Sequence, residues 1–524
     1  MKAEPSESHR DPNHTQAWLI GGGIASLSAA VYLVSEAQVP GPNIHLLDLH
    51  SGPGGGMTPR EDPQRGSMTK LLSLVPSKTN LKGTLLDDVR RFETIERPQP
   101  QTAALSRALK LGPSGPEIVE TKSLSIGAKN RMNLVKIMLE RESTLGSKSI
   151  EDIMDEDFFG TTFWMLWTTE FELQPWHSAV EFRRHLRKYL ENIQQLNNVI
   201  KSNRTEFNLH ESLIEPIMIY LREGGVDFNF NTEVTNLTVY PKEDPVTVTS
   251  IELLRDGIEH TVDINAIDIV IVTLGSTSAG ASLGTNRSSP PNLSLTWETE
   301  LTRDWRLWQR LSQDSPKFGQ PNNFLSQCLK STLETFTSTF EGPEFMLLYE
   351  KLTHDRPGTG ARISLTESNW GISLSIPRQP LFSSQSRTMN IICGIALNPT
   401  REGNFVKKAM YKCSGEEILI EILSHLQFPI EPILSSSKTV PCGMPLGTAP
   451  LLSRHEKDRP LVIPQSTTNI ACVGQFVEIP GETTLSMDYS VHSAQIAVTR
   501  LMGLPGEPEE IRENRLLQVL HLMF

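Results

Sequence analysis

One short segment near the beginning of the chain most constrains the fold. Residues 17–20 form a short apolar run, three glycines follow, and residues 24–34 have the composition of a helix rich in Ala and Leu. A second apolar run covers residues 43–48. Strand, glycine turn, helix and strand within about thirty residues are the pattern of a dinucleotide-binding unit. The sequence therefore predicts an α/β fold with a parallel sheet at this end of the chain.

The glycine turn has the residue types that a bound pyrophosphate requires. Gly21 and Gly23 lack a Cβ, so the turn can be tight and the backbone can approach the phosphates. The helix that begins at Ile24 and Ala25 points its free N–H groups at the same charge. Ser26 stands where a third glycine usually allows the helix to pack on the strand, and its small side chain still fits. The alternative, a glycine turn without a ligand, is disfavoured because both flanking elements are present.

Three later segments indicate FAD rather than NAD. Their order resembles the large class of flavoproteins with a glutathione-reductase-like FAD domain. In that class one strand ends near the adenine, a second returns the chain to the dinucleotide sheet at a glycine, and the last precedes a glycine near the ribityl–phosphate. The matching positions here are Val234 after residues 225–233, Gly275 after residues 269–274, and Gly474 with Gln475 after residues 470–473. The position of Gln475 is often Asp in the class. Asp48, at the end of the second apolar run, would accept hydrogen bonds from the ribose hydroxyls.

Length, charge and cysteine usage exclude several classes of protein. A chain of 524 residues suggests two to four domains. The net charge of -12 argues against a nucleic-acid partner. The five cysteines are scattered without a CxxC pair, which excludes a zinc ribbon and favours a reducing compartment. No secretory h-region and no long apolar run is visible, so we expect a soluble, cytoplasmic protein. We also expect no metal site.

The middle of the chain has an unusual density of aromatic residues. Seven of them lie between Phe158 and Trp176 in a stretch with helical periodicity. A packed helical core and the lining of an apolar tunnel both explain them, and the two are not exclusive. We expect His177 to be a hydrogen-bonded structural histidine. The basic run at residues 183–188 is expected to be a solvated helix face.

These segments together resemble the oleate hydratase family, also called the myosin-cross-reactive antigen family. The matching pieces run in the same order from about Trp18 to Leu501. They are residues 21–27, Pro53-Gly54-Gly55, residues 158–178, Arg378-Gln379-Pro380, and residues 413–418, 474–478 and 488–491. Gly54 and Gly55 therefore join the candidate cofactor residues. The resemblance implies a FAD domain built from separated segments, an inserted substrate domain and a helical part.

The patterns and the resemblance together predict five parts of the chain. They are a disordered arm at residues 1–15, a FAD domain from residues 16–130, 222–300 and 441–502, a helical part at 131–221, a substrate domain at 301–440, and a short C-terminal segment at 503–524.

The resemblance also implies a reaction. Members of the family add water across a cis double bond of a free unsaturated fatty acid, with FAD organising the site and no net redox change. An unactivated alkene needs an acid that protonates one carbon and a base that directs water at the other. The ligand, an unsaturated fatty acid or a similar long apolar molecule, needs an apolar tunnel. A homodimer and a peripheral contact with a membrane are compatible with this interpretation.

Two parts of the family's catalytic apparatus have no counterpart here. The family has a glutamate on a loop between segments that match residues 62–66 and 75–77, and roughly a dozen residues of that loop are missing. Two tyrosines of the family, one of them the proposed proton donor, are replaced by Phe207 and His210. Histidine exchanges a proton near neutral pH, so His210 is the candidate catalytic acid, and Glu61, Asp62 and Glu211 are candidate bases.

Three functions remain open from the sequence: a fatty-acid hydratase, a FAD-dependent oxidoreductase acting on a lipid-like metabolite, and a non-catalytic protein that binds FAD and lipid. An oxidoreductase would use the flavin ring directly and would need no separate acid and base.

Overall fold

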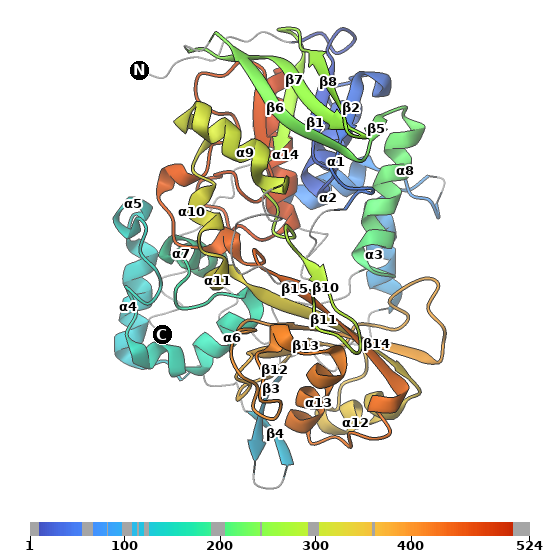
Figure 1. Ribbon diagram of the computed structural model, residues 1–524, viewed down its shortest axis with the longest axis vertical. Coiled ribbons are helices and arrows are strands. Elements are labelled where there is room, and N and C mark those ends of the chain that lie inside the picture. Colours follow the sequence, from blue (N-terminus) through green and yellow to red (C-terminus); the bar gives the residue numbers. More distant parts are fainter. Residues whose placement is uncertain are drawn as a thin grey trace.

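The computed structural model describes ten ranges of the chain: residues 10–54, 66–80, 82–96, 107–112, 115–119, 125–189, 205–241, 244–291, 303–358 and 362–506. Within them, a parallel sheet lies at one end of the molecule, a large mostly antiparallel sheet lies at the other, and a group of helices lies beside both (Figure 1). The predicted α/β class is therefore confirmed. Gly55, Glu61 and Asp62 lie outside the described residues.

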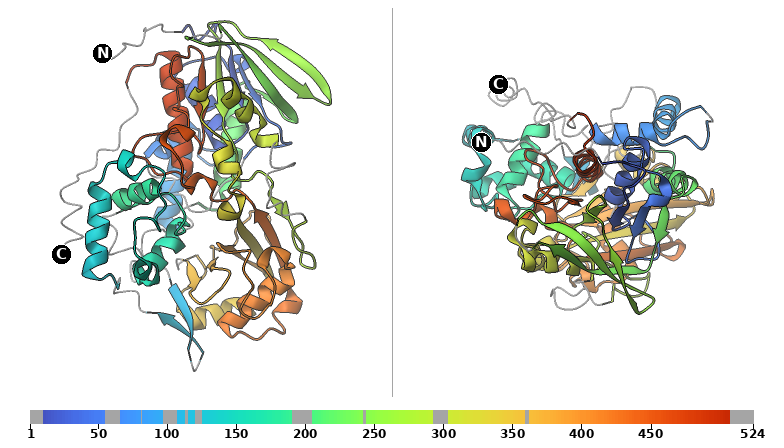
Figure 2. Two further views of the ribbon diagram at one scale, coloured as in Figure 1. Left: turned by 60° about the vertical axis from the view of Figure 1, so that its left-hand side comes forward. Right: turned by 90° about the horizontal axis from the view of Figure 1, so that it is seen from above.

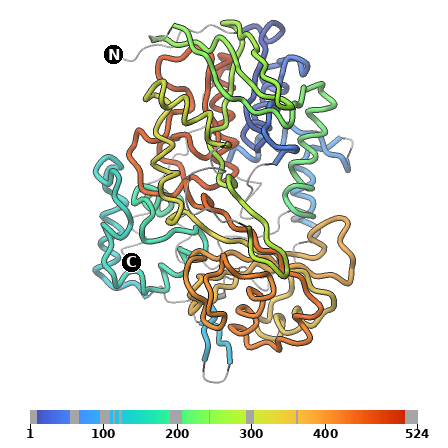
Figure 3. Tube along the Cα trace, in the orientation of Figure 1, coloured from blue at the N-terminus to red at the C-terminus, as the bar shows by residue number. Residues whose placement is uncertain are grey.

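The parallel sheet is formed by strands that are far apart in the sequence. Its order is β16 (Ile470–Val473), β9 (Ile269–Thr273), β1 (Ala17–Ile20), β2 (Ile44–Leu47) and β5 (Asp227–Asn229), with every neighbour parallel. β9 and β16 are apolar along most of their length because a parallel sheet is covered on both faces. The first and last segments of the chain meet in this domain, as the blue and red parts of Figure 3 show.

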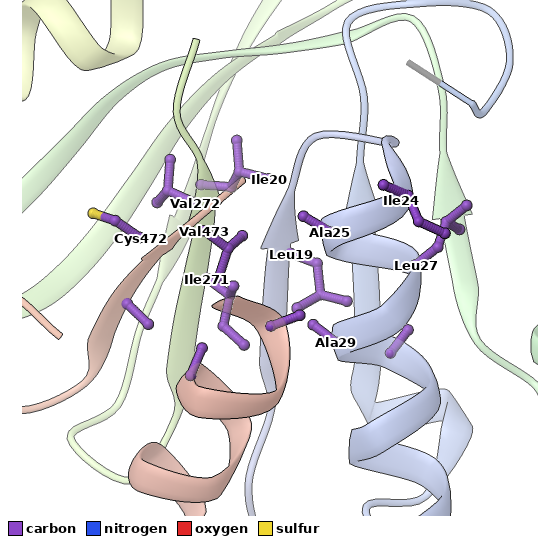
Figure 4. Packing of buried hydrophobic residues seen from close by; sticks show 14 of the residues in the cluster. Leu19, Ile20, Ile24, Ala25, Leu27, Ala29, Ile271, Val272, Cys472 and Val473 are labelled. Carbon is purple, nitrogen blue, oxygen red and sulfur yellow. The ribbon is translucent and has the colours of Figure 1, made fainter. Parts of the chain in front are cut away.

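Two helices cover the parallel sheet and bury its apolar residues. α1 (Ile24–Ser35) follows β1, and α14 (Met487–Met502) follows β16. Ten consecutive residues of α1, from Ile24 to Leu33, are buried. Strand residues such as Leu19 and Ile271 lie beside the small side chains of α1 in this core (Figure 4). Small residues let the helix approach the sheet closely, as the Ala-rich sequence predicted.

A three-stranded antiparallel sheet extends the same domain. It consists of β6 (Thr232–Tyr240), β7 (Thr247–Arg255) and β8 (Ile258–Asp263). Helix α9 (Arg303–Asp314) packs against β6. Trp305 and Trp308 of α9 are buried in the core of the parallel sheet, although the sequence placed residues 301–440 in the substrate domain.

The second large sheet has eight strands. Its order is β10 (Ser282–Leu283), β15 (Ser437–Met444), β11 (Leu333–Glu341), β14 (Met389–Ala396), β13 (Ile372–Ser375), β12 (Ile363–Leu365), β3 (Arg107–Gly112) and β4 (Gly115–Val119). All neighbours are antiparallel except β12 and β3. The helices α12 (Glu344–Thr353) and α13 (Gly415–Leu426) pack on one face. Residues 107–112 and 115–119, expected with the FAD domain, thus belong to this sheet.

The helical part contains α4 (Ala128–Leu139), α5 (Glu142–Leu145), α6 (Thr162–Phe171) and α7 (Ala179–Tyr189). These are the teal and blue-green helices in the left-hand view of Figure 2. The side chain of Thr161 caps α6 by accepting from the Trp164 N–H. Phe158, Phe163 and Trp167 are fully buried together, which agrees with the packed-core interpretation of the aromatic segment.

The basic run on α7 is buried, so the prediction of a solvated helix face is wrong. Arg183, Arg184, His185 and Arg187 each expose less than a tenth of their surface. α7 lies against segments that supply carboxylates, and a guanidinium group tolerates burial when carboxylates and other acceptors surround it. Those partners lie far away in the sequence, so the run alone could not reveal them.

The other α-helices each supply buried residues to the core that contains the parallel sheet. They are α2 (Gly66–Leu74), α3 (Leu85–Glu96), α8 (Glu215–Glu223) after a π-helical turn (His210–Ile214), α10 (Asn322–Leu325) and α11 (Cys328–Ser331). None of the helices that the structure describes is both long and apolar enough to cross a membrane.

The predicted disordered arm, residues 1–15, includes residues that contact the folded domain. Arg10 donates a hydrogen bond to the Leu501 carbonyl, and Thr15 is fully buried. Residues 1–9 lie outside the described residues. The chain therefore joins the folded domain from about residue 10 onward.

Candidate functional site

A cleft opens where the carboxyl ends of the parallel strands meet the N-terminus of α1. We call it the dinucleotide cleft. Its lining includes ten of the twelve predicted cofactor residues: Gly21, Gly23, Ile24, Ala25, Asp48, Gly54, Val234, Gly275, Gly474 and Gln475. Of the other two, Ser26 lies behind the turn and Gly55 lies outside the described residues. Segments that are more than four hundred residues apart in the sequence are thus brought together as expected.

The glycines of the first turn are required for two different reasons. Gly21 has a φ of +109°, and a Cβ there would lie 2.9 Å from the Thr273 Cβ. A Cβ on Gly22 would lie 2.1 Å from the Asp48 carboxylate. A Cβ on Gly23, by contrast, would have no described atom within 4 Å. Packing therefore explains the first two glycines, whereas the open space at Gly23 suits a ligand that approaches the backbone.

Helix α1 presents a suitable electrostatic environment for a pyrophosphate. Gly23 is its N-cap and supplies no side-chain hydrogen bond, and the first turn contains no acidic residue. The N–H groups of that turn and the positive end of the helix dipole therefore remain available to an anion. Ser26 turns away to the strand, where its Oγ lies 2.9 Å from the Thr273 Oγ1.

Charged residues surround the end of the cleft at which an adenosine would lie. Asp48 is 6% exposed and accepts a hydrogen bond of 2.6 Å from the His50 N–H. Burial raises the pKa of Asp48. His50 lies 3.0 Å from Asp304, and that hydrogen bond raises the pKa of the imidazole. Glu233 forms ion pairs with Arg303 at 3.0 Å and with Arg306 at 2.7 Å.

Apart from Asp48, sequence reasoning missed this charged rim. Arg303 and Asp304 belong to α9, which the sequence assigned to another domain, and their partners lie in two separate segments. Only the position of Glu233 immediately before Val234 was a signal, because that strand was already expected to meet the adenine.

The opposite end of the cleft is formed by the turn after β16 and by the beginning of α14. Gly474 has a φ of +99°, and its N–H donates to the Ser493 Oγ at 2.9 Å. Gln475 lines the cleft beside Met487 and Ser490. This end can hold the ribityl and flavin portions of a dinucleotide, as the resemblance implies.

His210 lies at the edge of the cleft. It is exposed, it begins the π-helical turn, and its N–H donates to the Asn208 Oδ1 at 3.0 Å. A Cβ placed on Gly54 would lie 3.7 Å from the His210 Nδ1. Glu211, the next residue, accepts a hydrogen bond of 2.9 Å from the Ser383 N–H. His210 therefore lies beside Gly54, one of the candidate cofactor residues. One carboxylate oxygen of the adjacent Glu211 already accepts a hydrogen bond from the backbone.

One carboxyl group near the cleft was not singled out by sequence reasoning. Asp488 is the second residue of α14 and lies between the cleft residues Met487 and Ser490. It accepts a hydrogen bond of 3.0 Å from the Met68 N–H, and burial raises its pKa. It therefore holds the first residues of α2, which follow the shortened loop. Its position in the late family match was the only available signal.

His177 has the structural role that the sequence predicted. The imidazole is fully buried; its Nδ1 accepts from the Gln174 N–H at 3.0 Å, and its Nε2 lies 3.3 Å from the Thr448 hydroxyl. Burial lowers the pKa of His177 to about 3. A histidine that stays neutral and fully hydrogen-bonded does not serve as a proton donor at neutral pH.

Comparison with known proteins agrees with this geometry. The chain is 30% identical over 521 residues to an oleate hydratase of Streptococcus pyogenes serotype M49 (strain NZ131), covering 94% of this chain and 86% of the relative. It is 27% identical over 549 residues to a linoleate hydratase of Lactiplantibacillus plantarum, covering 94% of each chain. Among solved structures, cyclohexylamine oxidase from Brevibacterium oxydans IH-35A has a TM-score of 0.50 at 12% identity, covering 93% of this chain and 99% of that one, a likeness that concerns the fold alone. The model of the MCRA family matches residues 14–499, and the chain belongs to this family.

Proposed function

We propose that this protein binds FAD and adds water to a cis double bond of an unsaturated fatty acid. The observation that carries the proposal is family membership along residues 14–499, with relatives named oleate hydratase and linoleate hydratase that align over 94% of the chain. The alignment includes both the dinucleotide cleft and the eight-stranded sheet. A reaction that needs both parts is therefore the reasonable expectation.

The residues of the dinucleotide cleft fit FAD. Gly23 and the N-terminus of α1 would hold the pyrophosphate, Asp48 would accept from a ribose hydroxyl, and Gly474 with Gln475 would face the ribityl chain. When bound, the flavin supplies a flat conjugated ring that, by the family resemblance, organises the site without net redox change. The side chains of this protein must then supply the proton and the oriented water.

His210 is the side chain that we propose as the acid. The resemblance implies a proton donor in its segment, and the imidazole lies close to Gly54, which lines the cleft. Phe207, at the other tyrosine position, cannot donate a proton. Glu211 would serve as a base only with the oxygen that does not accept from Ser383. General acid–base groups contribute roughly 10²–10⁴-fold each, so we expect slow hydration compared with an intact family member.

The test is to incubate the FAD-loaded protein with oleate and with linoleate and to follow the products by mass spectrometry. Hydration adds the mass of one water while the visible spectrum of the flavin stays oxidised. His210→Phe should reduce product formation, whereas the matched change His260→Phe, on exposed strand β8, should not.

Four other outcomes would contradict parts of the proposal. Bleaching of the flavin by substrate, with an oxidised product, would indicate the oxidoreductase. Fatty-acid binding without any product would indicate a non-catalytic protein. Rates equal to those of an intact family member would show that the missing groups are replaced in full, and equal rates in His210→Phe would remove that residue from the mechanism.

A further inference from the structure

A loop of the eight-stranded sheet contacts the turn that carries His210. Residues 377–388, which we call the sheet loop, lie between β13 and β14. On one side of His210, the Asn208 N–H donates to the Leu381 carbonyl at 2.9 Å, and the Asn208 Nδ2 donates to the same oxygen at 3.4 Å. On the other side, the carboxylate of the next residue accepts from an N–H of the loop at 2.9 Å. The turn is therefore attached to the sheet loop on both sides of His210.

Asn208 also fixes the backbone of the turn. Its Oδ1 accepts from the His210 N–H at 3.0 Å and from the Glu211 N–H at 3.1 Å. The same side chain thus accepts from the turn and donates to the sheet loop. A displacement of Leu381 would move Asn208 and, with it, the backbone of His210. The imidazole, which lies close to Gly54 of the dinucleotide cleft, would then change its position relative to the cofactor residues.

The sheet loop has little apolar packing that could hold its shape. Residues 382–384 and 386–388 are exposed, and the aromatic side chain among them, Phe382, exposes 39% of its surface. An exposed segment with few buried apolar contacts opens at little cost in free energy. The conformation in which the loop reaches the turn therefore depends on polar contacts.

Gln385 supplies the hydrogen bonds that close the sheet loop. Its Oε1 accepts from the Leu381 N–H at 2.7 Å and from the Phe382 N–H at 3.4 Å. Its Nε2 donates to the Met389 carbonyl at 2.8 Å and to the Gln379 Oε1 at 2.7 Å. The two acceptor positions and the two donor positions of the amide are all used. One side chain thus connects the part of the loop that contacts the turn with the first residue of β14.

Gln379 connects this amide to the sheet itself. Its Nε2 donates to the Pro377 carbonyl at 2.9 Å and to the Ile391 carbonyl at 2.8 Å, and its Oε1 also accepts from the Ile391 N–H at 3.1 Å. Ile391 belongs to β14 and is buried. A continuous series of hydrogen bonds therefore leads from β14 through Gln379 and Gln385 to Leu381 and the turn.

We propose that Gln385 is a positioning residue for His210, because it holds the sheet loop in the conformation that orients the turn. The inference rests on the proposed function in that His210 is the acid of the hydration. The described residues that line the dinucleotide cleft do not include Gln385, so its effect on the reaction would pass through the loop and Asn208. A displacement of about 1 Å can cost on the order of 10²-fold in rate, and we expect Gln385→Ala to lower kcat about tenfold or more.

The first measurement reports the position of His210 and does not require hydration. Protein saturated with FAD and isotope-labelled at the Cε1 of its histidines gives a nuclear magnetic resonance signal for His210, which is identified by its loss in His210→Phe. Gln385→Ala should shift or broaden this signal. Gln385→Asn should do the same, because it keeps the amide but is too short to reach both ends of the loop. The visible absorbance of bound flavin would show that both variants are folded.

The matched control is Gln327→Ala. Gln327 is also half-buried, and its Nε2 donates to the Asn323 carbonyl at 2.7 Å, in a segment apart from the sheet loop. Its replacement removes a comparable side-chain hydrogen bond and should leave both the His210 signal and kcat as they are in the wild type.

The second measurement is a double-mutant cycle in the hydration of oleate. If Gln385 acts through His210, Gln385→Ala should lower kcat about tenfold or more in the wild type, and by less than about twofold in His210→Phe. Equal losses in both proteins would indicate a general structural effect and would overturn the proposal. A rise in KM with unchanged kcat would also overturn it, because the loop would then act on substrate binding.

The two measurements separate failure of this proposal from failure of the proposed function. An unchanged His210 signal in both Gln385 variants would overturn the positioning role, whatever the rates. A displaced signal in a protein that hydrates neither oleate nor linoleate would contradict the proposed function, while the control of His210 by the sheet loop would be supported.

Discussion

The charge of Glu181 should be one of the largest single contributions of a side chain to the stability of this protein. Its carboxylate is fully buried on α7 and lies 2.9 Å from Arg454, 3.4 Å from Arg459 and 3.8 Å from Arg184. These arginines hold the pKa of Glu181 below its ordinary value, against the effect of burial. The carboxylate is therefore ionised at neutral pH, and three neighbouring arginines depend on its charge.

We expect Glu181→Gln to destabilise the protein by about 3–5 kcal/mol, the usual cost of removing one partner from a buried ion pair. The magnitude follows from the charges that are buried together. Three carboxylates, Glu142, Glu181 and Glu478, pair with four buried arginines, Arg183, Arg184, Arg454 and Arg459. The amide keeps the shape of the side chain and leaves one buried positive charge without compensation. The loss of free energy therefore comes from the uncompensated charge and not from a cavity.

Thermal and urea denaturation followed by circular dichroism would measure this effect. A loss of 3–5 kcal/mol should lower the melting temperature by on the order of 5–10 °C. The control is Glu259→Gln on exposed β8, which should melt with the wild type. If Glu181→Gln melted within a degree of the control, the cost of burying these charges would equal their attraction, and the reasoning would be refuted. If adding Arg459→Gln to the variant recovered no stability, uncompensated charge would not be the cause.

Three further predictions concern other parts of the molecule. Gly23→Val should abolish uptake of FAD, seen as loss of visible flavin absorbance, because its side chain would occupy the open space at α1; uptake equal to wild type would refute the assignment of the cleft. Burial raises the pKa of Glu334 to about 8. The contribution of its neutral form to the free energy of unfolding is therefore fully present below the ordinary pKa of about 4.3, and it is lost as the pH rises through 8. The free energy of unfolding of Glu334→Gln should therefore exceed that of the wild type by roughly 2–4 kcal/mol at pH 9 and equal it near pH 4. Parallel profiles of unfolding free energy against pH for the two proteins would contradict the burial of that carboxyl. Gly394→Ala should cost about 1–3 kcal/mol or more, because its Cβ would lie 2.0 Å from the Phe336 ring; Gly160→Ala, where no described atom lies within 4 Å, is the control, and equal unfolding midpoints would disprove the clash.

The parts of the fold that the sequence predicted are those with local signals. Helix α1 begins at Ile24 and ends at Ser35, one residue beyond the expected range, because its glycine start and Ala-rich composition are read within a dozen residues. Strands β3 and β4 were not expected in the eight-stranded sheet. β3 joins the sheet by pairing with β12, which follows it by more than two hundred residues. The residues of β3 alone do not indicate a partner at that distance in the sequence.

The candidate site also contains residues with local signals and residues whose partners are distant in the sequence. Gly21 and Gly23 could be assigned from the sequence because their role depends on backbone geometry within one turn. The ion pair of Glu233 with Arg303 could not, since it joins residues from two elements that were assigned to different domains. The basic run beginning at Arg183 was misinterpreted for a related reason: charge predicts exposure only when no distant carboxylates cover it.

Cofactor binding and catalysis depend on different kinds of groups, and this explains why one is better supported than the other. The dinucleotide cleft is formed largely by backbone and small residues on regular elements, whose positions are set by the packing of α1 and α14 on the sheet. Substitution elsewhere changes such a site little.

An acid and a base, by contrast, are single side chains, and a displacement of about 1 Å can cost on the order of 10²-fold in rate. His210 stands on a π-helical turn, a geometry that is frequent at functional sites because it allows a side chain to be re-aimed. The shortened loop and the exchanged tyrosines therefore affect the step that tolerates error least. FAD binding should survive the divergence of this chain from its family, while the rate of hydration, and the substrate on which it is highest, should be the properties that have changed.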